Sequence, residues 1–240
     1  MTAATPSLRT LPAITLPEVP TRRTLRVCAL FGLGVELGDA DDGAARAADS
    51  AATLRAHLAP GRVVLVTGPS GSGKSRMVRS LVTAIARDPA AICVRPRPGH
   101  SAPVLSCASA VDAIKGDLTR SLGVLAAAGL ADARVLTTPA QFLSDGQQQR
   151  LALAIAIDRA ERLLALGRQV VLVADEFAMT LDAHTAQSVA HAASRWARRS
   201  GAALVVAAAR EDLVEHLEPD VVAACALEGG VDFVTRADQP

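Results

Sequence analysis

The stretch that most constrains the fold of this chain is a short apolar run that leads directly into a glycine-rich segment. Residues 63–66 are Val, Val, Leu and Val, which suits a strand buried on both faces of a parallel sheet. Residues 68–75 read GPSGSGKS and match the G-x-x-x-x-G-K-[ST] phosphate loop. Apolar residues recur at helical spacing over residues 75–87. The pattern predicts a strand, a phosphate-binding loop and a helix, in that order.

The spacing of this loop has a mechanical reason. Glycines let the backbone turn tightly, so that successive N–H groups point into one anion-sized hollow at the start of a helix. Lys74 can then reach the β- and γ-phosphates of a nucleotide, and the Ser75 hydroxyl can bind Mg²⁺. Lysine is otherwise found only at Lys115, which argues against a chance match. The residues expected to contact the nucleotide are Gly68, Pro69, Ser70, Gly71, Ser72, Gly73, Lys74 and Ser75.

Composition bounds the class of protein. A length of 240 residues suits one domain with a large core, and the 2% aromatic content favours an aliphatic sheet core over an aromatic-rich β-sandwich. The net charge of +1 gives no strong field toward nucleic acid or an anionic membrane. The four cysteines form no C-x-x-C pair, and neither a membrane span nor a secretory signal is evident. We therefore expect a reduced, cytoplasmic setting without direct membrane insertion.

The ends and connections of the chain are less clearly marked. Residues 1–24 are rich in Pro and Thr and are expected to form a disordered tail, with the domain itself over residues 25–240. Residues 25–33 suit a first strand or a short helix, and residues 44–59 a helix or a strand; both alternatives stay open. The pattern further predicts helices over residues 110–128, 185–199 and 211–217, strands over 92–94 and 202–208, and a closing hairpin from 221–227 to 231–235.

A second informative stretch, residues 142–167, reads FLSDGQQQRLALAIAIDRAERLLALG. Ser144 or Asp145 can cap a helix that begins near Gly146, and Gly167 can end it. Residues 151–157 are apolar throughout, so that part of the helix should be buried. The exposed N–H groups at the start of a capped helix can also bind an anion. Taken alone, however, this segment looks like any ordinary helix start.

The third stretch, QVVLVADE at residues 169–176, predicts a buried strand that ends in two adjacent carboxylates. A carboxylate at the carboxyl end of a strand beside a phosphate loop is suited to hold Mg²⁺, which assigns Asp175 to the metal together with Ser75. Glu176 can polarise a water aligned with the γ-phosphate. Glu176 and Lys74 are therefore the expected catalytic residues.

Taken in order, the phosphate loop, LSDGQ at residues 143–147, VVLVADE at 170–176 and TLD at 180–182 resemble an ABC-type ATPase. The resemblance implies an α/β fold with a mainly parallel sheet flanked by helices and a reduced helical subdomain that carries the signature motif. It implies hydrolysis of ATP with Mg²⁺ in a head-to-tail homodimer, in which the signature of one subunit closes on the nucleotide of the other. The residues that it adds to the nucleotide site are Ser144, Gly146, Gln147 and Asp182.

Four positions depart from the family pattern. Asp145 replaces a glycine of the LSGGQ signature, and Ala209 stands where the switch histidine is expected. No glutamine lies between Lys74 and Gln141, so the Q-loop glutamine is missing, and Phe31 is the one weak candidate to stack on adenine. These departures predict retained nucleotide binding with a low rate of hydrolysis.

Within this family, several details resemble more closely the soluble, non-transporter members, including those fused to acetyltransferase domains. These details are LSDGQ, ADEF at residues 174–177 and REDLVEHLEPDVV at 210–222. Two alternatives stay open: the ATP-binding subunit of an ABC transporter, and a nucleotide-gated interaction protein with little turnover. The short interval from Lys74 to Ser144 argues against the first, and the missing histidine favours the second. A protein or nucleic-acid partner is expected without being identified.

Overall fold

The computed structural model describes residues 13–16, 20–37, 40–97, 109–227 and 229–236. The chain divides into two compact units, Met1–Arg46 and Ala47–Pro240. The first unit contains strand β1 (Ala13–Leu16), helix α1 (Arg22–Leu30) and strand β2 (Gly34–Leu37), with β1 and β2 parallel. Within the predicted tail, residues 13–16 thus form a strand, while 1–12 and 17–19 lie outside the described residues. The alternative left open for residues 25–33 is resolved as a helix.

The second unit is built on a six-stranded sheet with the order β4-β5-β6-β3-β7-β8. All neighbouring pairs are parallel except β7 and β8, which form the predicted closing hairpin. The strands are β3 (Val63–Thr67), β4 (Ala91–Val94), β5 (Gln169–Ala174), β6 (Ala203–Ala207), β7 (Val221–Cys225) and β8 (Val231–Thr235). The predicted α/β class with a mainly parallel sheet is confirmed.

Strand β3 shows why its sequence is apolar without a break. Val63 and Leu65 belong to one hydrophobic cluster, whereas Val64 and Val66 belong to the other. Successive side chains of a strand point to opposite faces, so a central strand that is covered on both faces needs an apolar residue at every position. All four side chains are fully buried. Each contributes about 1.5–3 kcal/mol relative to an exposed position.

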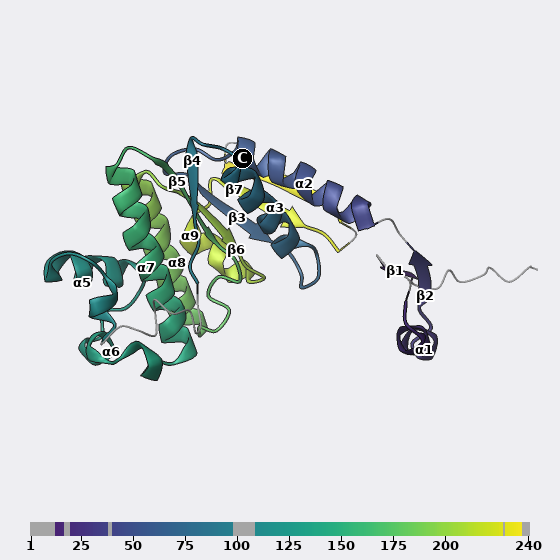
Figure 1. Cartoon of the computed structure of the whole chain (residues 1–240), viewed down its shortest axis with the longest axis horizontal. Coiled ribbons are helices and arrows are strands. Elements are labelled where there is room, and N and C mark those ends of the chain that lie inside the picture. Colours follow the sequence, from purple (N-terminus) through teal and green to yellow (C-terminus); the bar gives the residue numbers. More distant parts are fainter. Residues whose placement is uncertain (1–12, 17–19, 38–39, 98–108, 228, 237–240) are drawn as a thin grey trace, which may run out of the picture. The chain divides into compact units, whose positions relative to one another are not determined.

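Helices cover both faces of this sheet (Figure 1). Helices α2 (Ala40–Ala56) and α3 (Lys74–Ala86) pack with Val64 and Val66, chiefly through Leu54, Met77 and Leu81. The other face is covered by α7 (Asp145–Ala165) and α8 (Ala183–Ser200), with the short η3 (Glu211–Leu213) and α9 (Val214–Leu217) beside them. Most of residues 44–59, for which the sequence left both helix and strand open, therefore belong to helix α2.

A small helical region leads from β4 to α7. It contains η1 (Val111–Ala113), α5 (Leu118–Ala127), α6 (Ala133–Thr137) and η2 (Ala140–Phe142). Helix α5 is held to α7 by Arg120, which bonds the buried carboxylate of Asp158 and, at 3.0 Å, that of Glu161. Arg162 pairs with Asp158 as well, at 2.6 Å. Because a buried carboxylate is costly unless it is paired, these two arginines make Asp158 tolerable at a helix–helix contact.

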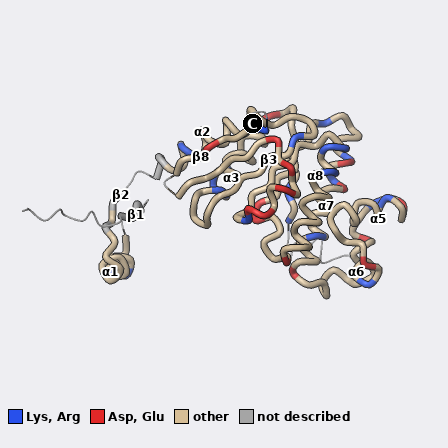
Figure 2. Tube along the Cα trace, turned by 180° about the vertical axis from the view of Figure 1, so that it is seen from behind, with Lys and Arg blue, Asp and Glu red and all other residues tan. Residues whose placement is uncertain are grey.

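Acidic and basic residues alternate along α7, whereas α8 carries arginines near its end and no acidic residue (Figure 2). Trp196, set between arginines in the sequence, is buried and donates its indole N–H to Glu161 at 3.2 Å. Trp196 thus belongs to the core. None of the helices within the described ranges combines the length and the apolar character needed to cross a membrane.

Candidate active site

The phosphate loop turns sharply between β3 and α3. Gly68, Gly71 and Gly73 have φ angles of 139°, 85° and 93°, a region that favours glycine. At Gly68 a Cβ atom would lie 2.2 Å from the carbonyl oxygen of Cys225, so a side chain has no room there. Gly73 is the N-cap of α3 and has no side chain to satisfy the first N–H groups of that helix. The loop therefore presents free backbone N–H groups that can donate hydrogen bonds to an anion.

Lys74 and two hydroxyl groups belong to the loop or directly precede it in the chain. Lys74 Nζ donates to the carbonyl oxygens of Gly68 and Pro69, each at 2.7 Å, so the ammonium lies over the loop backbone. Within the described part of the chain, Ser72 Oγ and Thr67 Oγ1 are buried without a hydrogen-bond partner. A buried unpaired polar group costs about 1–3 kcal/mol, so these hydroxyls are suited to bind an acceptor such as a phosphate oxygen. This chemistry fits a polyphosphate.

The two residues predicted to hold Mg²⁺ lie together although they are far apart in sequence. Ser75 Oγ donates to Asp175 Oδ1 at 3.2 Å, and the backbone N–H of Glu176 donates to the same oxygen at 3.1 Å. The described residues include no group of three or more His, Cys, Asp or Glu side chains that could hold a metal alone. A hydroxyl and one carboxylate fit Mg²⁺, which usually takes its other oxygens from phosphates and water.

The turn after β5 has an unusual backbone. Glu176 and Ala178 have φ angles of 52° and 57°, although neither is glycine. Such residues cost about 1–3 kcal/mol each and persist where neighbouring bonds hold them. The N–H of Phe177 donates to Ala207 of β6 at 2.9 Å, and Gln149 Nε2 donates to the Glu176 carbonyl at 3.2 Å. The Glu176 side chain itself is exposed.

The signature segment forms the start of α7. Ser144 is the N-cap: its Oγ accepts the N–H of Gln147 at 3.4 Å, and Gln147 Oε1 accepts the N–H of Ser144 at 3.0 Å. Of the two capping residues left open by the sequence, Ser144 is thus the one used. Ser144 and Asp145 are exposed. At Gly146 a Cβ atom would lie 2.8 Å from Leu181 Cδ2, so glycine lets the TLD segment approach the helix.

Asp182 lies at the start of α8, where it caps the helix. Its carboxylate accepts the N–H of Thr185 at 2.9 Å, and hydrogen bonds from Thr185 hold the pKa of Asp182 below its usual range. Arg210, which follows Ala209, donates to the Leu181 carbonyl at 3.1 Å and pairs with Asp212 at 2.8 Å. The contact between Arg210 and the TLD segment was not predicted, because nothing in the sequence links two residues so far apart.

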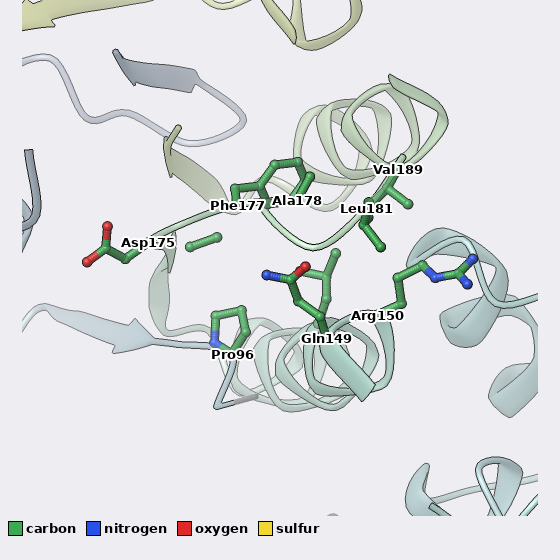
Figure 3. Close-up of a pocket in the computed structure, with 10 residues that line it drawn as sticks. Pro96, Gln149, Arg150, Asp175, Phe177, Ala178, Leu181 and Val189 are labelled. Atoms are coloured by element: carbon green, nitrogen blue, oxygen red, sulfur yellow. The ribbon is translucent and has the colours of Figure 1, made fainter. Parts of the chain in front are cut away.

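A mostly apolar pocket adjoins Asp175, between α7 and the turn after β5 (Figure 3). Gln149 projects from α7 toward this turn, whereas the Arg150 guanidinium extends away and donates to the Gly129 carbonyl at 2.8 Å. No sequence pattern singles out Gln149. The pocket is lined by Pro96, Gln149, Arg150, Leu153, Ala174, Asp175, Phe177, Ala178, Leu181 and Val189.

Comparison with known proteins relates the chain to ATP-binding proteins. The family model described as AAA ATPase domain matches residues 49–217. The lipoprotein-releasing system ATP-binding protein LolD of Maricaulis maris is 31% identical over 192 residues, which cover 67% of this chain and 80% of that protein. The zinc import ATP-binding protein ZnuC of Pseudomonas fluorescens is 31% identical over 128 residues, or 49% of this chain. The match spans only 48% of ZnuC, about half of its length.

Solved structures agree with the fold. A dimeric ATP-binding cassette in a post-hydrolysis state with ADP and Pi has a TM-score of 0.54 at 18% identity, covering 75% of this chain and 87% of that one. A dimeric bacterial ABC transporter cassette has a TM-score of 0.53 at 19% identity, with the same two coverages.

Proposed function

The chain belongs to the ABC-type P-loop ATPases, and from this premise we propose that it hydrolyses ATP with Mg²⁺ at the interface of a head-to-tail dimer of itself. The observation that carries the proposal is the contact between Ser75 Oγ and Asp175 Oδ1 at 3.2 Å, with Glu176 next in the chain. It joins the phosphate loop to the strand-end carboxylates, which are the two parts that phosphoryl transfer to water requires.

Each residue has a role that follows from its chemistry. Lys74 and the loop N–H groups bind the phosphates, and the Glu176 carboxylate orients the attacking water and accepts its proton. Ser75 and Asp175 would hold Mg²⁺, which supplies neutralisation of the phosphate charge when bound.

The signature supports the dimer. Ser144, Asp145 and Gly146 form the first turn of a capped helix whose end is open to solvent, and that end carries the positive pole of the helix dipole. In a two-fold dimer, Ser144 and Gly146 of each copy close on the phosphates held by the loop of the other. Gln147 is engaged in the capping box and acts by fixing Ser144.

Within the family we propose a soluble, cytoplasmic, non-transporter role with slow turnover. LSDGQ and ADEF support the narrower likeness to members fused to acetyltransferase domains, and Ala209 in place of the switch histidine supports slow hydrolysis. The second candidate function is that of a transporter's ATP-binding subunit. One specific observation favours it: LolD and ZnuC, to which the chain is similar, carry the names of such systems.

The experiment measures phosphate release by the purified chain with ATP, with and without Mg²⁺, and after addition of detergent-solubilised membranes from the source cells. We expect Mg²⁺-dependent turnover that membranes change by less than about twofold. Stimulation of tenfold or more that copurifies with an integral membrane protein would favour the transporter subunit. Absence of Mg²⁺-dependent turnover together with absence of ATP binding would refute both.

A further inference from the structure

Gln149 bridges two parts of the turn that carries Glu176. Its Nε2 donates a hydrogen bond to the Glu176 carbonyl oxygen at 3.2 Å, and its Oε1 accepts a hydrogen bond from the Thr180 hydroxyl at 2.9 Å. Figure 3 shows the Gln149 side chain reaching from α7 toward this turn. The Gln149 amide thus bonds one residue before and one residue after Ala178, which has a left-handed backbone: its NH₂ group bonds Glu176 and its oxygen bonds Thr180.

The Glu176 backbone needs such support. With φ at 52°, Glu176 is in a conformation that only surrounding bonds maintain in a non-glycine residue. The Cα–Cβ direction turns with the backbone, so the bond to the Glu176 carbonyl also helps to fix the direction in which the side chain leaves the backbone. Met179 N–H donates to the same carbonyl at 3.3 Å, but this bond lies within the turn and cannot tie it to another element.

Helix α7 links Gln149 rigidly to the signature. Ser144 and Gln149 are five residues apart, which is about 1.4 turns, or about 7–8 Å along the axis at about 1.5 Å per residue. The capping box fixes the helix start, and Gly146 packs against Leu181 of the segment that Gln149 also contacts through Thr180. A shift of the helix start therefore moves the Gln149 amide relative to the Glu176 turn.

We propose that Gln149 is a positioning residue that couples the exposed start of α7 to the Glu176 turn of the same chain. The inference rests on the proposed dimer, in which Ser144 contacts the nucleotide of the partner copy. Gln149 then connects the two nucleotide sites: closure of α7 on one ATP sets the carboxylate that acts on the other.

Conservative variants separate this role from packing. Gln149→Glu keeps an acceptor for Thr180 and loses the donor to Glu176, while Gln149→Leu loses both bonds. Thr180→Val removes only the hydroxyl, and Thr180→Ser restores it. Gln141→Glu, at an exposed position on η2, is the matched control for the added charge. Measurements are kcat, KM and the Hill coefficient for ATP, with ATP-dependent dimerisation by sedimentation.

We expect both Gln149 variants to lower kcat about tenfold or more, with KM within about twofold, dimerisation retained and the Hill coefficient lowered to about 1. Thr180→Val should show a smaller loss that Thr180→Ser reverses. Unchanged kcat in Gln149→Leu, an equal loss in Gln141→Glu, or loss of ATP binding and dimerisation together with kcat would overturn the proposal. A wild-type chain without turnover or ATP-dependent dimers would instead refute the proposed function on which it rests.

Discussion

Replacement of Asp145 by glycine tests how the signature helix presents its charge. Asp145 is the first residue of α7 and is exposed, while the cap is made by Ser144 and Gln147. An acidic residue in the first turn stabilises a helix by roughly 0.3–1 kcal/mol, and glycine costs about 0.5–1 kcal/mol relative to alanine. Because aspartate is itself a weak helix former, we expect Asp145→Gly to lower the free energy of unfolding by about 0.5–1.5 kcal/mol.

The effect on the dimer depends on where the carboxylate points. A carboxylate directed at the partner's γ-phosphate would bring two like charges into a partly desolvated site. Removing it would strengthen the dimer; a hundredfold gain corresponds to about 2.7 kcal/mol at 1.36 kcal/mol per factor of ten. We expect instead that the carboxylate points away, since an ATP-driven dimer has to form with it present, and that the dimer dissociation constant changes less than about threefold.

The assay is sedimentation velocity over a range of protein concentrations with ATP and Mg²⁺. A Glu176→Gln background keeps the nucleotide from being consumed. Asp145→Asn removes the charge without the flexibility of glycine, and Ser144→Arg should block the dimer by filling the phosphate-facing side. A dimer dissociation constant a hundredfold lower in both Asp145 variants would refute the reasoning. It would mean that the Asp145 carboxylate faces the phosphate and weakens the ATP-bound dimer of the natural protein.

Three further predictions concern single residues of the site. Lys74→Ala should abolish tight ATP·Mg²⁺ binding with the circular dichroism spectrum unchanged, because the loop loses its ammonium; unchanged affinity in a fluorescence titration would contradict this. Glu176→Gln should slow turnover about a hundredfold or more and retain the ATP-bound dimer, since the water loses its base; purely monomeric elution from a sizing column with ATP would count heavily against the dimer. Because the pKa of Asp182 is lowered by the bonds from Thr185, its charged form stabilises the fold above the usual aspartate pKa of about 3.9, and that contribution is lost as the pH falls through the lowered value. Asp182→Ala should therefore lower the free energy of unfolding at neutral pH and reduce its fall at acid pH, as measured by urea denaturation over a range of pH. Identical profiles for the variant and the wild type would show that the Asp182 cap does not cause the acid loss of stability.

The parts of the fold that the sequence predicts well are those where burial dictates every residue. Strand β3 is apolar at each position because helices cover both of its faces, and the glycines after it are required by φ angles and by the carbonyl of Cys225. In the alanine-rich residues 44–59, large apolar side chains are too few to show a helix or a strand period, so α2 stayed open, and the structure shows Leu54 packed against the sheet.

The parts that could not be predicted depend on distant partners. No glycine marks the left-handed turn at Glu176 and Ala178, because bonds from α7 and β6 hold it. Gln149 is one of three consecutive glutamines, and only the folded chain shows that its amide bonds Glu176 and Thr180. Arg210 likewise gains its contact with Leu181 through tertiary structure.

The strand order has a consequence for synthesis of the chain. Strand β3 lies between β6 and β7, yet both are made more than a hundred residues after it. At a translation rate of about 5–20 residues per second, the apolar segment 63–66 stays without its partner strands for roughly 7–30 s on the ribosome. In that interval the phosphate loop lacks one of its packing partners, because the Cys225 carbonyl that lies against Gly68 has not been made. We therefore expect the nascent chain to be prone to aggregate until β6 and β7 have been made, because the apolar strand β3 is then without partners.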